Sequence, residues 1–399
     1  MAYINPNKVE YTNNSQVDAL NRLRTTTIKT MFDSPLKYNK EEFLWDEKIF
    51  NGGSSSYNNT ENLVDLEVYT TGDRVIRQSR QYFYFQSGKS HVGMLSTNLK
   101  QDSANVEKEV GFFDDNNGLF FRYDGYNDNI SLVLRSDITG TVTEQVIQKS
   151  NWSLDKMDGT GPSKINLDFT NMQLFYFDFA WTGIGRLRVG VVINGEVHYV
   201  EQFEAANTQP TNSFGTPSLP IRFEITSNGD NSVLKQQASS ILVEGDYDKR
   251  GIQTSVNTGL DSVRVSGRTP LISLRLKSEY NRAQIIPNSI KLLQDSLFST
   301  IYYEVIMRPD TFDGITWNSM SELMISEYNT DAENVSGGLL LNSGYIPTRM
   351  GMPLSLDLET ILPLGSDIDG NTDIISVIAQ NASGNNAPVY ASLTFREIY

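Results

Sequence analysis

The sequence predicts an all-β protein in which antiparallel β-sandwich, jelly-roll-like domains follow an extended N-terminal arm. Apolar and polar residues alternate with a period of two in many short runs, which is the pattern of half-buried strands. Residues that favour turns separate these runs, and no helical period intervenes between them. The 19 Tyr and 19 Phe residues of this 399-residue chain also favour strands over helices.

Residues 1–60 are predicted to form the arm, because they are rich in Asn and Thr and alternate little. Their one helical signal spans residues 17–24, where Leu20 and Leu23 would share a face. A helix this short is marginal in water, so it needs a partner surface. A frayed terminus is the alternative, although large apolar side chains are seldom left in solvent without a use. The arm residues that we predict at an assembly interface are Leu20, Leu23, Trp45 and Phe50.

The first β domain is predicted over residues 61–245. Its strands are expected at residues 64–68, 75–85, 92–97, 119–123, 130–135, 141–148, 173–179, 186–193, 197–203 and 221–226. Alternation is lost over residues 244–260, so a second β-rich domain is predicted over residues 246–399. Its strands are expected at residues 271–276, 300–307, 339–341, 374–379 and 389–396, with a short helix or an irregular loop at 316–328.

The Asn-Gly dipeptide at residues 194–195 predicts a β-hairpin with a two-residue type I′ turn. A turn of this type determines the register of both flanking strands. In that register Glu201 is neutralised by Arg188, and opposite charges across strands stabilise a sheet. The predicted pairs are Val192 with Val197, Val191 with His198, Gly190 with Tyr199, Val189 with Val200 and Arg188 with Glu201.

The formal net charge of −15 argues against a nucleic-acid partner, since neutralising phosphates requires clustered Lys and Arg. The same charge disfavours docking on an anionic membrane, and no apolar run approaches the roughly 18 residues of a membrane span. With no cysteine, the chain has no thiolate nucleophile and no sulfur ligand for a metal. We therefore expect a soluble protein with no nucleic-acid partner and no membrane insertion.

Side chains suited to catalysis are scarce. A serine hydrolase needs a base beside its nucleophile, and neither His91 nor His198 lies in such a context. A glycosidase needs only two carboxylates and a groove lined by aromatic rings, and several acidic residues lie near Trp181. The same rings would stack on sugars, so a carbohydrate-binding surface is the more favourable use of them. We therefore expect no catalytic residue and no organic cofactor.

One acidic turn is a candidate for binding Ca²⁺. Residues 367–373 offer oxygen ligands at alternate positions around Gly370, as calcium loops do, but the distal bidentate Glu is missing. A plain Asp-Gly hairpin is the alternative. The candidate ligands are Asp367, Asp369, Asn371 and Asp373.

Several stretches of the chain together indicate a relationship to a known family. They are residues 17–24 with Leu36 and Tyr38, 75–90, 152–163 with Leu167 and Asp168, 178–190, 203–207 and 219–225. With them the chain resembles virion structural proteins of tailed bacteriophages, many of them marine, most closely over residues 15–245. The resemblance implies a component of a phage particle and brings no catalytic residues.

These stretches also have a physical interpretation as scaffold. Trp181 is expected to be a core or interface anchor, and Arg186 and Arg188 are expected to pair with carboxylates across the sheet. We therefore predict a non-enzymatic virion structural protein in a capsid-surface, neck or tail appendage, made in the host cytoplasm. It would assemble with itself, with a trimer as the expected form, and with other virion proteins. The alternatives are a host-recognition module that binds surface glycans and a polysaccharide-degrading enzyme.

Overall fold

The structure, a computed structural model, describes residues 2–5, 8–11, 15–100, 104–180, 184–216, 218–245, 251–296, 298–314, 316–346, 354–358 and 363–398. Strands account for nearly all of its regular structure, and two short 3-10 turns, Lys149–Asn151 and Ser278–Tyr280, interrupt them. All strand pairs are antiparallel, so the predicted all-β class is confirmed. Two compact units, Met1–Asp248 and Lys249–Tyr399, divide the chain close to the expected boundary.

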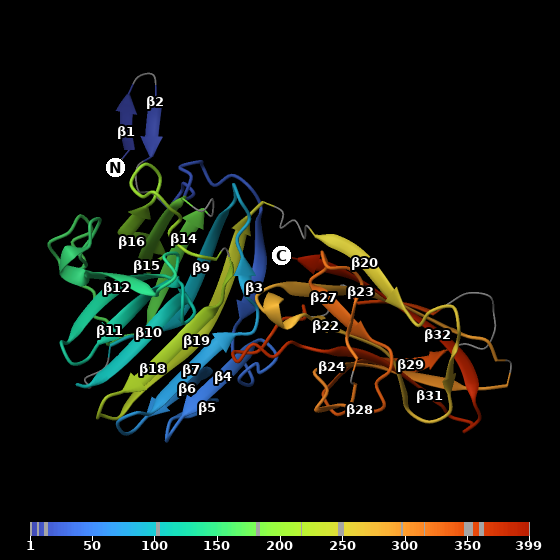
Figure 1. Ribbon diagram of the computed structural model, residues 1–399. Helices are drawn as coiled ribbons and strands as arrows, with labels where there is room; N and C mark the ends of the chain where they lie inside the picture. The colour runs from blue at the N-terminus through green and yellow to red at the C-terminus, as the bar shows by residue number, and fades with distance from the viewer. Residues whose placement is uncertain are drawn as a thin grey trace. The chain divides into compact units, whose positions relative to one another are not determined.

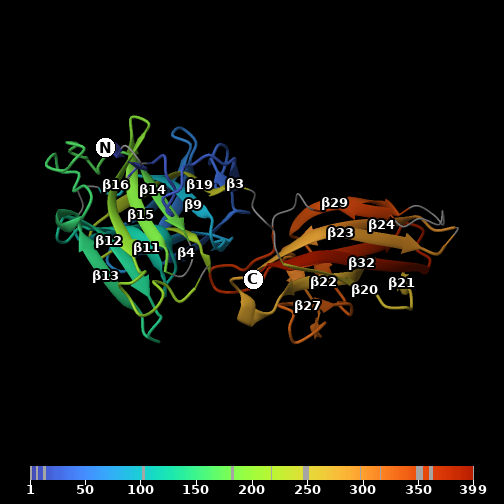
Figure 2. The same cartoon turned by 90° about the horizontal axis from the view of Figure 1, so that it is seen from above.

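The N-terminal unit is a sandwich of two sheets (Figures 1 and 2). The seven-stranded sheet has the order β13 (Thr143–Gln148), β12 (Asn129–Ser136), β11 (Gly118–Asp124), β10 (Val106–Phe113), β18 (Ile221–Ser227), β7 (Arg74–Ser79) and β4 (Trp45–Phe50). The eight-stranded sheet has the order β16 (Glu196–Glu204), β15 (Arg186–Ile193), β14 (Gln173–Ala180), β9 (Ser90–Thr97), β19 (Ser232–Glu244), β6 (Leu63–Val68) and β5 (Ser54–Asn58), with β3 (Ile28–Ser34) also pairing with β19. Two small two-stranded pairs complete it, β1 (Ala2–Asn5) with β2 (Lys8–Tyr11) and β8 (Phe83–Tyr84) with β17 (Ser218–Leu219).

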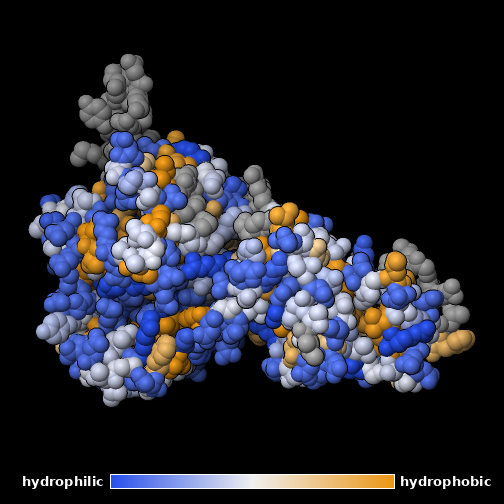
Figure 3. All heavy atoms as spheres, in the orientation of Figure 1, coloured by the Kyte–Doolittle hydropathy of each residue, from blue (hydrophilic) through white to orange (hydrophobic). Residues whose placement is uncertain are grey.

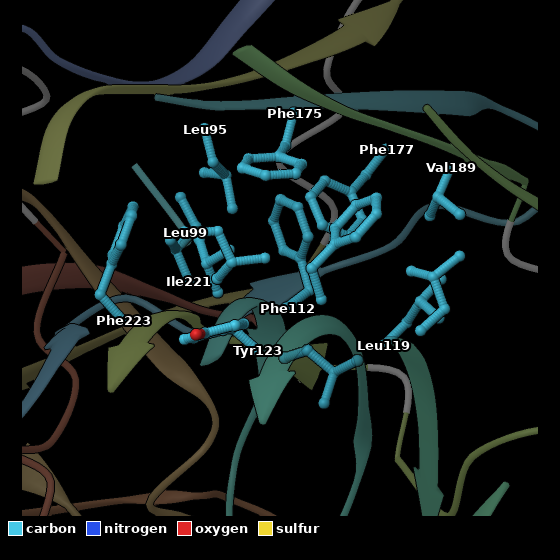
Figure 4. Close-up of a cluster of buried hydrophobic side chains, with 14 of the residues drawn as sticks. Leu95, Leu99, Phe112, Leu119, Tyr123, Phe175, Phe177, Val189, Ile221 and Phe223 are labelled. Carbon is cyan, nitrogen blue, oxygen red and sulfur yellow. The ribbon is translucent and has the colours of Figure 1, made fainter. Parts of the chain in front are cut away.

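Aromatic side chains from both sheets fill the space between the layers (Figure 4). Phe112 on β10 meets Phe177 on β14 edge to face, with ring centroids 5.2 Å apart. Phe121 on β11 lies 4.5 Å from Phe175, also on β14. Aromatic contacts like these two stabilise the core beyond the burial of their area. The ring of Phe112 fits because Gly93 on β9 has no side chain, since a Cβ there would lie 2.2 Å from the Phe112 Cζ atom.

The predicted arm over residues 1–60 is wrong for most of its length. β3, β4 and β5 lie within residues 28–58 and are strands of the two main sheets. Trp45, predicted at an assembly interface, is 2% exposed and packs against Phe32 and Phe223 in the core. Its indole N–H donates to the Ser34 hydroxyl over 2.7 Å, so the one polar group of the side chain has a hydrogen-bond partner inside the sandwich.

The hairpin at residues 194–195 forms with positive φ angles at Asn194 and Gly195, and its register is the predicted one as far as Gly190 with Tyr199. A β-bulge then shifts the register, so that Val189 lies opposite Glu201 and Arg188 opposite Gln202. The predicted pairs of Arg188 with Glu201 and of Val189 with Val200 are therefore wrong. Glu201 instead accepts a hydrogen bond from the backbone N–H of Ser153 over 2.9 Å.

The C-terminal unit has its own core between two further sheets. The five-stranded sheet has the order β20 (Ile252–Asn257), β32 (Ala387–Ile398), β23 (Gln284–Gln294) and β30 (Leu354–Asp357), with β21 (Val263–Val265) also pairing with β32. The six-stranded sheet has the order β26 (Asn318–Ser319), β27 (Ser326–Asn329), β22 (Thr269–Leu276), β31 (Ile375–Asn381), β24 (Ile301–Met307) and β29 (Leu339–Ile346). A small pair, β25 (Thr311–Phe312) with β28 (Val335–Ser336), lies outside both sheets. Residues 316–328 therefore contribute short strands and an irregular turn rather than a helix.

Replacing Gly93 by alanine tests the packing between the two sheets. We expect Gly93→Ala to lower the free energy of unfolding by about 1–3 kcal/mol, because the added methyl group overlaps the ring of Phe112. Ser96→Ala, on the opposite face of the same strand, is the control and should change it by less than about 0.5 kcal/mol. Denaturant titration measures both, and equal stabilities for the two variants would contradict the packing described.

Candidate functional site

Residues 15–24, which we call the strap, form a tight turn on the N-terminal unit rather than the predicted helix. Val17 pairs with Leu23 in a single β-bridge, and Asn21 takes a left-handed conformation with φ 64°. The carboxylate of Asp18 closes the turn by accepting hydrogen bonds from the backbone N–H groups of Leu20, over 2.9 Å, and Arg22, over 2.8 Å. An Asp side chain that binds the backbone two residues on competes with helix formation, which explains the failed prediction.

The buried carboxylate of Asp178, on β14, attaches the strap to the outer face of the eight-stranded sheet. It is fully buried and accepts hydrogen bonds from Arg24 of the strap over 2.7 Å, from the Tyr199 hydroxyl over 2.8 Å and from the Ser90 hydroxyl over 2.9 Å. The guanidinium group of Arg188 also donates to it, as predicted for a cross-sheet pair. A carboxylate with this many donors is stable in its charged form without water.

Two arginines on β15 bind the strap through its backbone. Arg188 donates to the Val17 carbonyl over 2.8 Å, and Arg186 donates to the Ala19 carbonyl over 3.0 Å. Arg186 therefore binds carbonyl groups of the strap instead of the carboxylate expected for it. Arg24 completes the attachment, because it also pairs with Glu244 at the end of β19. We call Arg24, Asp178, Arg186, Arg188 and Tyr199 the clamp.

The pKa values in the clamp show how strongly its groups are coupled. Burial alone would lower the pKa of the Arg24 guanidinium, but Asp178 opposes this and raises it above its ordinary value. Burial, together with the charge of Asp178, raises the pKa of the Tyr199 hydroxyl. Burial raises the pKa of the Tyr176 hydroxyl to about 12. Arg24 therefore keeps its charge, and both tyrosines keep their protons, throughout the ordinary pH range.

The outer face of the seven-stranded sheet carries a network of ion pairs that we call the charged face. Strand alternation places its members outward, and Glu109 on β10 lies opposite Glu224 on β18 and Arg122 on β11. On the face shown in the space-filling view, hydrophilic residues cover most of the N-terminal unit, with hydrophobic residues in separate groups between them (Figure 3). The charged face consists of Arg74, Glu107, Glu109, Asp115, Arg122, Arg135, Glu144, Arg222 and Glu224.

Arginines connect the carboxylates of the charged face from strand to strand. Arg122 lies 2.6 Å from Glu109 and 2.8 Å from Glu144, measured between guanidinium nitrogen and carboxylate oxygen. Arg135 on β12 lies 2.8 Å from Glu144 and 3.7 Å from Glu109. These bridges join β10, β11, β12 and β13 across the face, so the arginines and carboxylates hold each other in place.

Aromatic rings lie beneath these guanidinium groups. Phe113 and Phe120 stack with ring centroids 4.2 Å apart, and both are fully buried. Arg135 lies 4.7 Å above the ring of Phe120, and Arg222 lies 5.3 Å above that of Phe113. Arg222 also binds Glu224 on its own strand over 2.8 Å. Cation–π contacts of this kind, together with the ion pairs, cover the rings from solvent.

Burial changes the acidity of the carboxylates in the charged face. It raises the pKa of Glu109 to about 7, and the neighbouring charge of Glu224 adds to the increase while Arg122 opposes it. Burial also raises the pKa of Glu107. Burial would raise the pKa of Glu144 as well, but its bonds to Arg122 and Arg135 lower it below its ordinary value. Carboxylic acids that hold a proton near neutral pH are typical of functional sites, so this face is a candidate site.

The access to these groups limits what they can do chemically. Glu109 is 3% exposed and Glu224 is 6% exposed, and each is bound by arginine. A general acid must reach the substrate atom within hydrogen-bond distance, which neither carboxylate can do while those arginines hold it. The more exposed members, Asp115 and Glu107, lie at the rim with side chains 76% and 42% exposed. The charged face therefore supports the sheet and presents polar groups at its edge.

The predicted calcium loop is held by its own hydrogen bonds. The carboxylate of Asp367 accepts from the backbone N–H groups of Asp369, over 3.0 Å, and Asn371, over 2.8 Å. Asp373 pairs with Arg308 over 2.8 Å. Within the described parts of the chain, no three His, Asp or Glu side chains gather closely enough to hold a metal ion. The geometry is that of the Asp-Gly hairpin, and calcium binding stays a prediction.

The other predicted interface residues are scattered. Leu20 and Leu23 lie on the strap, 38% and 52% exposed. Phe50 lies on the outer face of β4, where Arg74 approaches its ring to 5.5 Å. Trp181 lies outside the described residues. Leu20 and Leu23 therefore remain available to another chain, whereas Trp45 in the core does not.

The clamp and the charged face could be predicted from the sequence only in part. The predicted pairing of Arg188 with a carboxylate is confirmed by Asp178, which lies directly opposite it on β14. The charged face was missed because β10 was not predicted, although Glu107 and Glu109 alternate with a period of two as strand residues do. A similar alternation of Arg222 and Glu224 on the neighbouring strand was a second signal for a charged sheet face.

The chain is similar in structure to several solved proteins. No family model and no curated protein matches the chain. A β-1,3-glucanase from Mycobacterium marinum is similar in structure over 53% of this chain and 98% of its own, with 9% identity and a TM-score of 0.35. Arcelin-5, a lectin-like defence protein from Phaseolus vulgaris, is similar over 55% of this chain and 100% of its own, with 8% identity and a TM-score of 0.33.

A third similar structure comes from a phage. The CBM2 module of the evolved Dit of Lactobacillus casei BL23 phage J-1 matches over 56% of this chain and 99% of its own. Its identity is 10% and its TM-score is 0.36. At such identities these similarities concern the fold alone. Among the described residues, no helix has the length and apolar character needed to cross a bilayer.

Replacing Glu109 by glutamine tests the electrostatics of the charged face. Because folding raises the pKa of Glu109 from 4.5 to about 7, its contribution to stability is complete below pH 4.5 and is lost as the pH rises through 7. This loss amounts to roughly 3–4 kcal/mol at most, at about 1.4 kcal/mol per pKa unit. We expect Glu109→Gln to lose less stability than the unaltered chain between about pH 4.5 and 8, as measured by denaturant titration.

Glu144→Gln is the matched control, because Glu144 binds the same two arginines but its pKa is lowered. Its contribution to stability is present above the ordinary carboxylate pKa and is lost as the pH falls, which is the opposite dependence. Parallel pH profiles for Glu109→Gln and the unaltered chain would show that Glu109 does not titrate as described.

Replacing Arg24 by methionine tests the clamp. The change removes the ion pairs with Asp178 and Glu244, so the strap should open more often. We expect amide hydrogens of residues 17–24 to exchange at least about tenfold faster, because tenfold requires only about 1.4 kcal/mol. Arg22→Met is the control, because the side chain of Arg22 is 54% exposed and pairs within the strap. Equal exchange in both variants would mean that the clamp does not hold the strap.

Proposed function

We propose that this chain is a non-enzymatic structural component of a tailed-phage particle, located in the virion and assembled with copies of itself and with other virion proteins. The observation that supports this role is the clamp, in which buried charges attach the N-terminal strap to a finished sandwich. The preceding hairpin, β1 with β2, pairs with no strand of the main sheets in the described part of the chain. A short N-terminal element joined to a rigid body by an ordered strap is suited to contacts between subunits.

The stretches that resemble virion proteins support the same role. Arg24 lies in one of them, and Asp178 and Arg188 lie in another. A further stretch contributes Arg222 and Glu224 to the charged face. The groups behind the resemblance are therefore those that hold the sandwich and its strap together, which is the work of a structural protein.

The inaccessibility of the buried carboxylates favours a role without catalysis. Glu109 and Glu224 are the pair on adjacent strands that a glycosidase could use, and arginines engage both. We expect incubation of the purified chain with bacterial polysaccharides to release no new reducing ends. Hydrolysis that disappears in both Glu109→Gln and Glu224→Gln would overturn the proposal of a non-enzymatic role.

Particles of the encoding phage provide the direct test of the structural role. We expect the chain to band with intact particles in a density gradient and to remain attached after a high-salt wash, because a structural component is held by more than screened surface charge. Mass spectrometry of the banded particles identifies it. Particles that are complete and infectious without this chain would refute the proposal.

Glycan binding is a second candidate function, favoured by the surroundings of Tyr69. Its side chain is 47% exposed, and its hydroxyl lies 2.9 Å from Glu67 and 3.0 Å from Ser54. An accessible ring beside a carboxylate and a hydroxyl is the combination that sugar sites use. A glycan array distinguishes the candidates, because a sugar ligand should bind the unaltered chain and not Tyr69→Ala. An array without hits would remove this candidate.

A further inference from the structure

β29 is an edge strand without the features that usually prevent edges from pairing. Its eight residues, Leu-Leu-Leu-Asn-Ser-Gly-Tyr-Ile, include no charged residue and no proline. Among the described residues it pairs with β24 alone, and it lies at the margin of the C-terminal unit (Figure 2). Long, uncharged, apolar edges are templates for another strand, so native proteins normally protect them.

The other edges of the main sheets are protected in this way. In the N-terminal unit, β4 carries Asp46, Glu47 and Lys48, β16 carries three glutamates, and β13 carries Glu144. β5, β26 and β30 are edges of only five, two and four residues. β20 is uncharged over six residues, but it is mostly polar. β3, which pairs with β19, carries Lys29 and Asp33, and β21 has only three residues. Among the described strands of the main sheets, β29 therefore differs from the other edges in being both long and apolar.

The side chains of β29 are arranged for a partner by a β-bulge. Tyr345 lies opposite Tyr302 and Ser343 opposite Glu304, whereas the bulge beyond Asn342 brings Leu340 opposite Ile306 and leaves Leu341 without a partner in the register. Leu340 and Tyr345 are five residues apart and would point to opposite faces in a regular strand. The bulge places both on the outer face, where they are 51% and 65% exposed.

We propose that β29 pairs antiparallel with β29 of a second copy of this chain, about a two-fold axis at Ser343. In this register Ser343 faces its own equivalent, and Gly344 faces Asn342 of the second copy. Because the bulge in each strand leaves Leu341 out of the pairing, Tyr345 then faces Leu340 of the second copy. By symmetry, Leu340 faces Tyr345 of the second copy. The contact is self-complementary, as a two-fold contact must be, and it covers both exposed side chains with an aromatic–aliphatic cross-strand pair.

The self-complementary register identifies a second copy as the occupant, and the local charge permits the contact. Two chains with a net charge of −15 repel each other, so they must meet where carboxylates are absent or neutralised. β29 has no charged residue, and the nearby carboxylate of Glu304 is neutralised by Arg268 over 2.8 Å. The inference rests on the proposed assembly role and gives that role a contact surface.

A single cysteine tests the two-fold axis, because the chain contains no other. Ser343→Cys would place two thiols opposite each other at Cα distances that antiparallel pairs and disulfides share. We expect mild oxidation to link most of the full chain into a covalent dimer on a non-reducing gel. Ser255→Cys is the matched control, because Ser255 is exposed at the centre of β20 and should give only a trace of dimer. Equal linking of the two variants would overturn the proposal.

Ser343→Lys tests the same contact without oxidation. It would set two ammonium groups face to face across the axis, which destabilises a cross-strand pair, while within each chain the new ammonium group would lie opposite the carboxylate of Glu304 at an exposed position. By size-exclusion chromatography with light scattering, we expect the unaltered chain to form a dimer or a multiple of it and Ser343→Lys to lose that contact while it stays folded. An unaltered chain that is monomeric at every concentration would overturn the proposal.

Failure of the β29 contact can be distinguished from failure of the proposed function. A monomer in solution that still bands with particles would remove the β29 contact and leave the structural role standing. A β29-linked dimer that is absent from particles would remove the structural role and leave the β29 contact standing.

Discussion

The order of the N-terminal segment depends on one buried carboxylate, that of Asp178. It accepts hydrogen bonds from Arg24 of the strap and from side chains of the two neighbouring strands, β9 and β15. The hydroxyl of Tyr199 on β16 also donates to it. A buried charge of this kind is stable only while its partners remain, and losing one partner leaves an unpaired charge away from water. The strap is therefore attached more firmly than its short length and its exposed Leu20 and Leu23 would suggest.

The two outer faces of the sandwich stabilise their buried charged side chains in different ways. On the eight-stranded sheet, Asp178 gathers cations around a single anion. On the seven-stranded sheet, arginines alternate with carboxylates over stacked rings, and burial leaves Glu109 with a pKa of about 7. In both networks the charged groups bind one another and the backbone. The sandwich thus has polar outer faces whose charged groups hold one another in place.

Alternation of apolar and polar residues was sufficient to predict the fold class and about half of the strands, and it failed where buried positions are polar. β10 was missed because Lys108 faces the core, where its ammonium group donates to the Val233 carbonyl over 2.7 Å and burial lowers its pKa to about 7. β19 was missed for a similar reason, with Gln236 and Ser239 buried along it. The β-bulge at Val189 depends on tertiary packing, which the local alternation of residues does not reveal.

The candidate sites were less predictable than the fold, because they depend on residues far apart in the chain. Arg24 and Asp178 are separated by 154 positions and meet only after both sheets have formed. Electron cryomicroscopy of intact particles tests the central claim most directly. We expect density for this chain in paired copies whose β29 edges form one continuous sheet. Particles in which the chain is absent, or in which its copies never approach each other, would contradict it.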